Sequence, residues 1–233
     1  GKTQTADVAK SPLYNFETGS NMGGINAGFY DVALILVDHV NYRWDADLDG
    51  QNQKLTLQFE IKKATSNYIN DLNILNWQYG VHNSTLNAPT AVSAFGTVIY
   101  TYLNSADEIV DDIANASAGQ YTLVAKVNET DNFVGTTNSI TFSILKKQIS
   151  GAWVSKNGST YFKLDNQADA DKFSVKYYDK NDAEVDFDDL ANGKEYTVKI
   201  ILNDYNNYEL VTTKNGTLVA ADYEKSFVFD NIT

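Results

Sequence analysis

One short acidic segment is the strongest candidate for chemistry in this sequence. Asp45-Ala46-Asp47-Leu48-Asp49-Gly50 places carboxylates at alternate positions ahead of a glycine. Carboxylates with this spacing supply the oxygen ligands of Ca²⁺ in calcium-binding loops. The chain has no glutamate where an EF-hand loop would need its twelfth residue, and no helical pattern flanks the segment. We therefore expect either a calcium site at Asp45, Asp47 and Asp49 or a plain polar hairpin turn.

Residues that could carry out catalysis are sparse. His39 and His82 are the two histidines, and the chain contains no cysteine. No Gly-x-Ser-x-Gly elbow, His-Glu-x-x-His segment or phosphate-binding glycine loop is present in the sequence. A second acidic cluster at Asp186, Asp188 and Asp189 is typical of a solvated loop. The sequence therefore predicts a protein that is not an enzyme and that holds no cofactor beyond the candidate calcium.

The charge balance restricts the partners. Lysine and arginine number 18 against 30 aspartates and glutamates, which gives a formal charge of −12. Such a surface repels phosphate backbones, so we expect no nucleic-acid binding. No apolar run approaches the roughly 18–20 residues that a membrane span needs. We expect no membrane insertion, and a monomer or a weak oligomer.

Aromatic residues recur in a fixed order along the chain. The step from tryptophan to the first tyrosine is 25 residues in two sets, the next step is 19 or 18, and the step to the following aromatic is 12 in both. A third set repeats the 12-residue step and the closing phenylalanine. Matched spacing of this length predicts one structural unit used several times. The sets are Tyr30, Tyr42 and Phe59; Trp77, Tyr102, Tyr121, Phe133 and Phe142; and Trp153, Tyr178, Tyr196, Tyr208 and Phe227.

The local sequence around these aromatic residues predicts β-strands. A glycine precedes each of Tyr30, Tyr121 and Tyr196, and an apolar run follows each. We expect that glycine to supply a positive φ in the turn that starts the strand. The closing segments alternate apolar and polar residues, the pattern of a strand with one buried face. Between these strands lie turns closed by asparagine and an aromatic: Asn41-Tyr42, Asn132-Phe133 and Asn207-Tyr208.

These patterns predict an all-β chain of three modules, at residues 1–64, 65–148 and 149–233. The first module is short or incomplete, because it has no counterpart of the tryptophan-bearing strand. A sandwich that lacks its opening strand exposes an unpaired sheet edge. We therefore expect residues 2–18 to form a substitute strand, or a neighbouring chain to supply one.

Three segments carry a resemblance to a known family: Trp77-Gln78-Tyr79-Gly80, Ala118-Gly119-Gln120-Tyr121 and Phe142-Ser143-Ile144-Leu145-Lys146-Lys147. Through them the chain resembles tandem bacterial immunoglobulin-like (Big-type) repeats of secreted or cell-surface proteins, best over residues 65–148. The resemblance implies Ig-like Greek-key β-sandwich modules in an elongated arrangement, outside the bacterial cell or on its wall. It implies a stalk, spacer or adhesive role and no chemistry.

The expected function is a non-catalytic structural or adhesive segment that acts as a stalk, a spacer or a protein-interaction module. Its expected partners are a host or cell-surface protein or a glycan. Trp77 and Trp153 hold matched repeat positions and are expected in the core. Trp44, Tyr177 and Tyr205 fall outside the shared set and are better candidates for surface contacts. If they formed an exposed platform, the alternative would be a carbohydrate-binding module set accessory to a secreted enzyme or adhesin.

Overall fold

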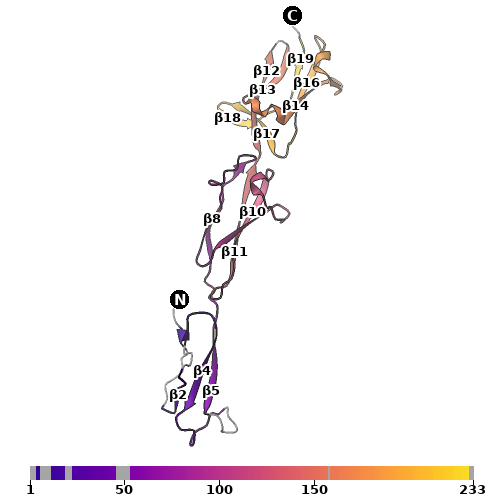
Figure 1. Cartoon of the computed structure of the whole chain (residues 1–233). Helices are drawn as coiled ribbons and strands as arrows, with labels where there is room; N and C mark the ends of the chain where they lie inside the picture. The colour runs from indigo at the N-terminus through magenta and orange to yellow at the C-terminus, as the bar shows by residue number, and fades with distance from the viewer. Residues whose placement is uncertain (1–3, 6–11, 19–22, 46–52, 157, 231–233) are drawn as a thin grey trace. The chain divides into compact units, whose positions relative to one another are not determined.

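The computed structural model of the chain is an all-β protein (Figure 1). It describes residues 4–5, 12–18, 23–45, 53–156 and 158–230. Within these ranges the helical elements are short 3₁₀ turns, and none is long and apolar enough to cross a membrane. The predicted all-β class is thereby confirmed.

Contacts divide the chain into two compact units, which are described separately. Unit 1 comprises Gly1–Leu72, Thr90–Tyr100 and Ala125–Ser139. Unit 2 comprises Asn73–Pro89, Thr101–Val124 and Ile140–Thr233. The strands β9, β10 and β11 each contribute residues to both units.

The strands lie in two-, three- and four-stranded sheets, ordered β1-β3, β2-β4-β5, β6-β8, β7-β11-β10-β9, β13-β12-β17-β18 and β15-β14-β16-β19. Their bounds are β1 Gln4–Thr5, β2 Tyr14–Phe16, β3 Gly23–Gly24, β4 Gly28–Leu36, β5 Lys54–Ile61, β6 Ile69–Asn73, β7 Trp77–Gln78, β8 Thr90–Ser93, β9 Val98–Leu103, β10 Gly119–Val127, β11 Thr136–Leu145, β12 Lys147–Lys156, β13 Ser159–Leu164, β14 Phe173–Asp179, β15 Glu184–Val185, β16 Glu195–Leu202, β17 Tyr208–Lys214, β18 Thr217–Ala220 and β19 Glu224–Val228. The 3₁₀ turns are η1 Ile113–Asn115, η2 Gln167–Lys172 and η3 Phe187–Asp189.

In unit 1 the apolar run after Tyr30 forms β4, the central strand of the β2-β4-β5 sheet. Its buried side chains include Val32 and Leu34, and Tyr30 stacks on Phe59 of β5 with ring centroids 5.4 Å apart. β2 pairs antiparallel with β4, placing Tyr14 opposite Leu36. Residues 2–18 therefore do contain a strand, but β2 lies beside β4 as β9 lies beside β10, whereas the tryptophan-bearing β7 pairs with β11. A substitute for the tryptophan-bearing strand itself stays a prediction.

In unit 2, the sheets β13-β12-β17-β18 and β15-β14-β16-β19 share one core. Ile149 and Phe162 of the first sheet pack with Ile200 and Leu202 of the second. Alternate residues of β16 are buried, from Tyr196 onward, while their neighbours face outward. Sequence alternation thus fixes which face of the strand meets the core.

Two details of the repeat differ from the sequence-based expectation. Trp77 lies on β7, opposite Ile144 in a parallel pairing, whereas Trp153 lies on β12 opposite Phe162. The two tryptophans therefore do not hold equivalent strand positions. Trp77 is 6% exposed, as expected of a core residue. Trp153 is half-buried and packs at the margin of the core.

The second detail concerns the glycine ahead of each strand-opening tyrosine. Gly28 and Gly193 have φ values of 149° and 73°, in the region that favours glycine. Gly119 does not have a positive φ. A local sequence motif therefore marks the same strand start in all three places without fixing one backbone conformation.

Candidate functional site

The predicted calcium loop lies at the edge of what the structure describes. Asp45 is exposed in a turn that follows Trp44. Asp47 and Asp49 lie outside the described residues. Among the residues that are described, no group of three or more histidines, aspartates or glutamates is arranged to hold a metal ion. The calcium site at Asp45, Asp47 and Asp49 stays a prediction.

The three candidate surface aromatics have different environments. Trp44 is half-buried, and its indole nitrogen donates to the Gln53 carbonyl at 3.0 Å. Tyr177 is half-buried against the ring of Phe187, and burial raises the pKa of its hydroxyl. Tyr205 is 70% exposed, and the Lys146 ammonium lies over its ring, 6.0 Å from the centroid. These residues do not supply the set of exposed rings that sugar stacking would need.

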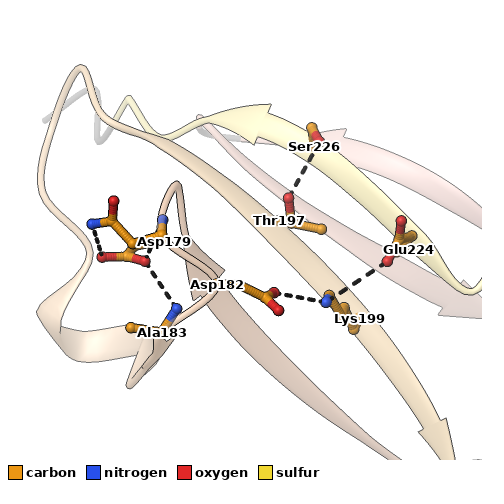
Figure 2. Close-up of polar contacts among 8 residues, drawn as sticks. Asp179, Asp182, Ala183, Thr197, Lys199, Glu224 and Ser226 are labelled. Carbon is orange, nitrogen blue, oxygen red and sulfur yellow. Dashed lines mark hydrogen bonds and ion pairs between the residues drawn. The ribbon is translucent and has the colours of Figure 1, made fainter.

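The outer face of the β15-β14-β16-β19 sheet is polar. Figure 2 shows Lys199 of β16 between two carboxylates, with its ammonium 2.9 Å from Asp182 and 3.9 Å from Glu224. The same ammonium lies 4.4 Å from the ring centroid of Tyr178. The carboxylate of Asp179 accepts main-chain hydrogen bonds within its own turn (Figure 2). Such exposed pairs stabilise a fold weakly.

A shallow hollow of about 510 Å³ lies beside Trp77. The ring of His82 meets Trp77 edge-on, with centroids 4.9 Å apart. Asn87 fixes the surrounding loop, because its amide donates to the Leu75 carbonyl and accepts from the Asn83 main chain. The Trp77 indole nitrogen is buried with no hydrogen-bond partner among the described residues. The described lining contains no carboxylate, hydroxyl or thiol, and the described ring contact of His82 is with Trp77.

Asn132, in the second of the three asparagine turns (Asn41-Tyr42, Asn132-Phe133 and Asn207-Tyr208), links distant parts of unit 1. The side-chain oxygen of Asn132 accepts from the Ala27 amide at 2.6 Å, and its side-chain nitrogen donates to Asn26 at 2.9 Å. Its main-chain carbonyl accepts from the Ala64 amide at 2.8 Å. One residue therefore ties the start of β4 to the segment that follows β5.

The asparagine of the third turn accepts the equivalent two hydrogen bonds in unit 2. The side-chain oxygen of Asn207 accepts from the Ala118 amide at 2.7 Å. Its main-chain carbonyl accepts from the Lys147 amide at 2.9 Å. Asn207 is 6% exposed, and its side-chain nitrogen donates to Asp204 at 2.6 Å. Both hydrogen-bonding functions of the buried amide are thereby satisfied.

The two asparagines are bonded to equivalent places in the repeat. Ala27 and Ala118 each lie three residues before the strand-opening tyrosine, Tyr30 and Tyr121. Sequence analysis identified the turns and the tyrosine segments as separate repeated features. It did not join them, because the partners of Asn132 and Asn207 are 105 and 89 residues away along the chain. We call these two contact sets the asparagine joints.

Each asparagine joint also contains a lysine. Lys63 lies 3.5 Å from the carboxylate of Glu129, at the start of the second turn. Lys146 donates to the main-chain carbonyl of Tyr205 in the third turn. Lys63 and Lys146 are exposed and lie next to the predicted module boundaries. Each contacts the turn that follows it in the repeat.

No protein-family model matches the chain, and no curated protein matches it.

Proposed function

We propose that this chain is a non-catalytic structural or adhesive segment of a bacterial extracellular or cell-surface protein. In this proposal Ig-like Greek-key modules follow one another in tandem and act as a stalk, a spacer or a protein-interaction surface. The bacterial and extracellular setting rests on the sequence resemblance. The mechanical role rests on the contacts described above.

A tyrosine corner supports the immunoglobulin-like assignment. The Tyr30 hydroxyl donates to the Asn26 carbonyl at 2.8 Å, and the Tyr121 hydroxyl donates to the Ser117 carbonyl at 2.8 Å. Immunoglobulin-like sandwiches carry such a tyrosine near the start of a late strand, bonded to the main chain a few residues upstream. Each corner also fixes the loop that bears the alanine amide of the asparagine joint.

The asparagine joint is the observation that carries the function. It occurs twice, between repeat-equivalent residues, and it uses main-chain and side-chain hydrogen bonds together. Short connections held by directional bonds favour a fixed orientation over free tumbling. A chain whose repeated asparagine turns hydrogen-bond to its own loops suits a spacer. The alternative of sugar binding is less favoured, because Trp44 and Tyr177 are half-buried.

The test measures whether the two segments joined by Asn207 in unit 2 keep one fixed orientation relative to each other. Residual dipolar couplings of residues 101–124 and 147–230 should fit one alignment tensor in the unmodified chain. In Asn207→Ala the two sets should require different tensors, because the Ala118 amide loses its partner. Independent tensors in the unmodified chain would contradict the proposal.

Asn181→Ala is the matched control. Asn181 lies in a comparable aspartate-asparagine turn, with its side chain 3.3 Å from the Asp179 carboxylate. Its side chain makes no contact across a predicted module boundary among the described residues, so the common tensor should survive. A loss of the common tensor in this variant would point to a general effect of truncating an asparagine turn.

A further inference from the structure

The first asparagine turn has the internal geometry of the third. In the first turn the Asn41 main-chain and side-chain nitrogens donate to the two oxygens of Asp38, at 3.0 and 2.7 Å. In the third turn Asn207 makes the same pair of bonds to Asp204, at 3.3 and 2.6 Å. The following tyrosine amide bonds to the aspartate carbonyl in both turns. The side chain of Asn41 is therefore oriented as the joint requires.

The first turn differs from the third in what covers it. Asn41 is exposed, whereas Asn207 is buried. Val40 is 83% exposed and Tyr42 is 48% exposed. The equivalent Tyr208 is half-buried, and its ring packs edge-on against Tyr79 at 5.7 Å.

The acceptor of the first turn has no partner in the described part of the chain. No described residue donates to the side-chain oxygen of Asn41, the atom that accepts the alanine amide in both joints. Its side-chain nitrogen is used by Asp38, so the oxygen projects from a fixed amide. The first turn therefore has an oriented acceptor, and exposed Val40 and Tyr42 lie beside it. The acceptor and the adjacent tyrosine are the features that the third turn contributes to its asparagine joint.

We propose that residues Asp38–Tyr42 form a docking surface for one further β-sandwich module of this same repeat type. The partner would present a main-chain amide three residues before a corner tyrosine, as Ala118 does before Tyr121. It would also present an aromatic ring to Tyr42, as Tyr79 does to Tyr208. This inference rests on the proposed function, because it extends the asparagine joint to a third turn.

The third module of a second copy does not fit this surface. At its corner the Gly193 amide donates to the Phe229 carbonyl at 2.8 Å. The Ala191 amide donates to the Tyr196 hydroxyl at 3.0 Å. The Ala27 and Ala118 amides are occupied by the chain's own joints. The occupant is therefore a module whose corner resembles the Ser117–Tyr121 segment and whose amide is free.

The direct test supplies such a module on the complete chain. An extra copy of residues 62–146 is fused ahead of Gly1, and only the copy carries ¹⁵N. Tethering makes docking intramolecular, so a weak contact suffices. The copied Ala118 amide should exchange with solvent about tenfold or more slowly than in the same fusion with Asn41→Ala. Protection at the copied Leu123 verifies that the copy is folded.

Matched variants define what each outcome means. Asn181→Ala should leave the slow exchange of the copied Ala118 amide unchanged. Equal exchange rates with and without Asn41 would overturn the inference, as would slow exchange that persists in Asn41→Ala. If the unmodified chain protects its own Ala27 and Ala118 amides while the copy stays unprotected, only this inference fails. If those two amides are themselves unprotected, the proposed function fails.

A second test needs no added module. The double variant Tyr205→His/Asn206→Val gives the third turn the residues of the first, since Asp204, Asn207 and Tyr208 already match. The Ala118 amide should keep its slow exchange, because the first turn is a competent acceptor. A tenfold or greater acceleration that approaches the rate in Asn207→Ala would show that the first turn cannot form a joint. That result would overturn the inference even if the fused copy failed to fold.

Discussion

At the scale of single residues, the rings of Trp77, Tyr102 and Tyr121 from the second repeat set converge on Phe142. Trp77 stacks on it at 5.3 Å and Tyr121 at 5.8 Å, while Tyr102 meets it edge-on at 6.1 Å. Offset-stacked and edge-on rings at such distances add to the stability gained from burial. The residues that first revealed the repeat therefore act in packing.

Truncation of Trp77 should be among the costliest single changes. Trp77→Ala removes a buried ring and leaves a cavity beside Phe142, so the free energy of unfolding of this part of the chain should fall by about 3–5 kcal/mol. Urea denaturation followed by fluorescence measures the change. Trp153→Ala should cost less, because the Trp153 ring is half-buried. A larger loss for Trp153 than for Trp77 would contradict this assignment of the core.

The aspartate-asparagine turns predict a pH dependence. The Asn41 side-chain hydrogen bond, followed by main-chain bonds, holds the pKa of Asp38 below its ordinary value of 3.8. Main-chain bonds from Ala183 and Asn181 lower the pKa of Asp179 in the same way. A depressed pKa in the folded state stabilises the turn above the unfolded pKa, and this contribution is lost as pH falls through the folded pKa.

We therefore expect the carboxylates of Asp38 and Asp179 to stay ionised from neutral pH to about pH 4, and the amide resonances of Asn41 and Asn181 to report their protonation below it. An NMR pH titration measures both turns in one experiment. In Asp38→Asn the shift at Asn41 should disappear while the shift at Asn181 remains. A midpoint above 3.8 for either aspartate would contradict the assigned hydrogen bonds.

At the scale of elements, β2 completes the sheet of the first repeat. It pairs with β4 along Tyr14, Asn15 and Phe16, and β4 pairs with β5 on its other edge. Without β2, that edge of β4 would present unpaired main-chain groups. The short strand therefore covers the edge of β4, while the place that the tryptophan-bearing β7 holds beside β11 has no counterpart beside β5 among the described residues.

Deletion of residues 1–18 should deprotect β4. Hydrogen exchange of residues 28–36 should accelerate, because part of the β4 main chain loses its partner and the sheet is reduced to two strands. Exchange of β16, which belongs to a different sheet, is the internal control. If β4 stayed as well protected in a monomer of the deletion variant, β2 would have no stabilising role.

At the scale of the whole molecule, the sheets differ in how much core they share. The two four-stranded sheets of unit 2 enclose a common cluster around Ile149 and Leu210. The β2-β4-β5 sheet of unit 1 has three strands, and on β5 Leu57 remains 41% exposed. A small unit buries a smaller fraction of its apolar surface and is correspondingly less stable.

Native-state hydrogen exchange should therefore rank the sheets. The slowest-exchanging amides of β4 and β5 should open with a lower free energy than those of β16 and β17. Measurement across a series of low denaturant concentrations separates local opening from global unfolding. Equal opening free energies in both regions would indicate one cooperative unit, contrary to the expected weakness of residues 1–64.

The strands themselves were largely predictable from the sequence. β4, β10 and β16 follow the tyrosine segments, and β5 and β11 follow the alternating closing segments, because a strand's side-chain period of two is written directly in the residue order. The asparagine turns were recognised for the same local reason. A strand within residues 2–18 was also predicted, but its place beside β4 was not.

The contacts across the chain were decided only by the tertiary structure. Trp77 and Trp153 match in spacing but occupy different strand pairings. Trp44 and Tyr177, the better candidates for surface contacts, lie half-buried. The burial of a ring depends on which sheet packs over it, and the spacing of aromatic residues along the sequence does not determine that. The partners of Asn132 and Asn207 are likewise distant in sequence. A turn motif determines how an amide is oriented, whereas the fold determines what it meets.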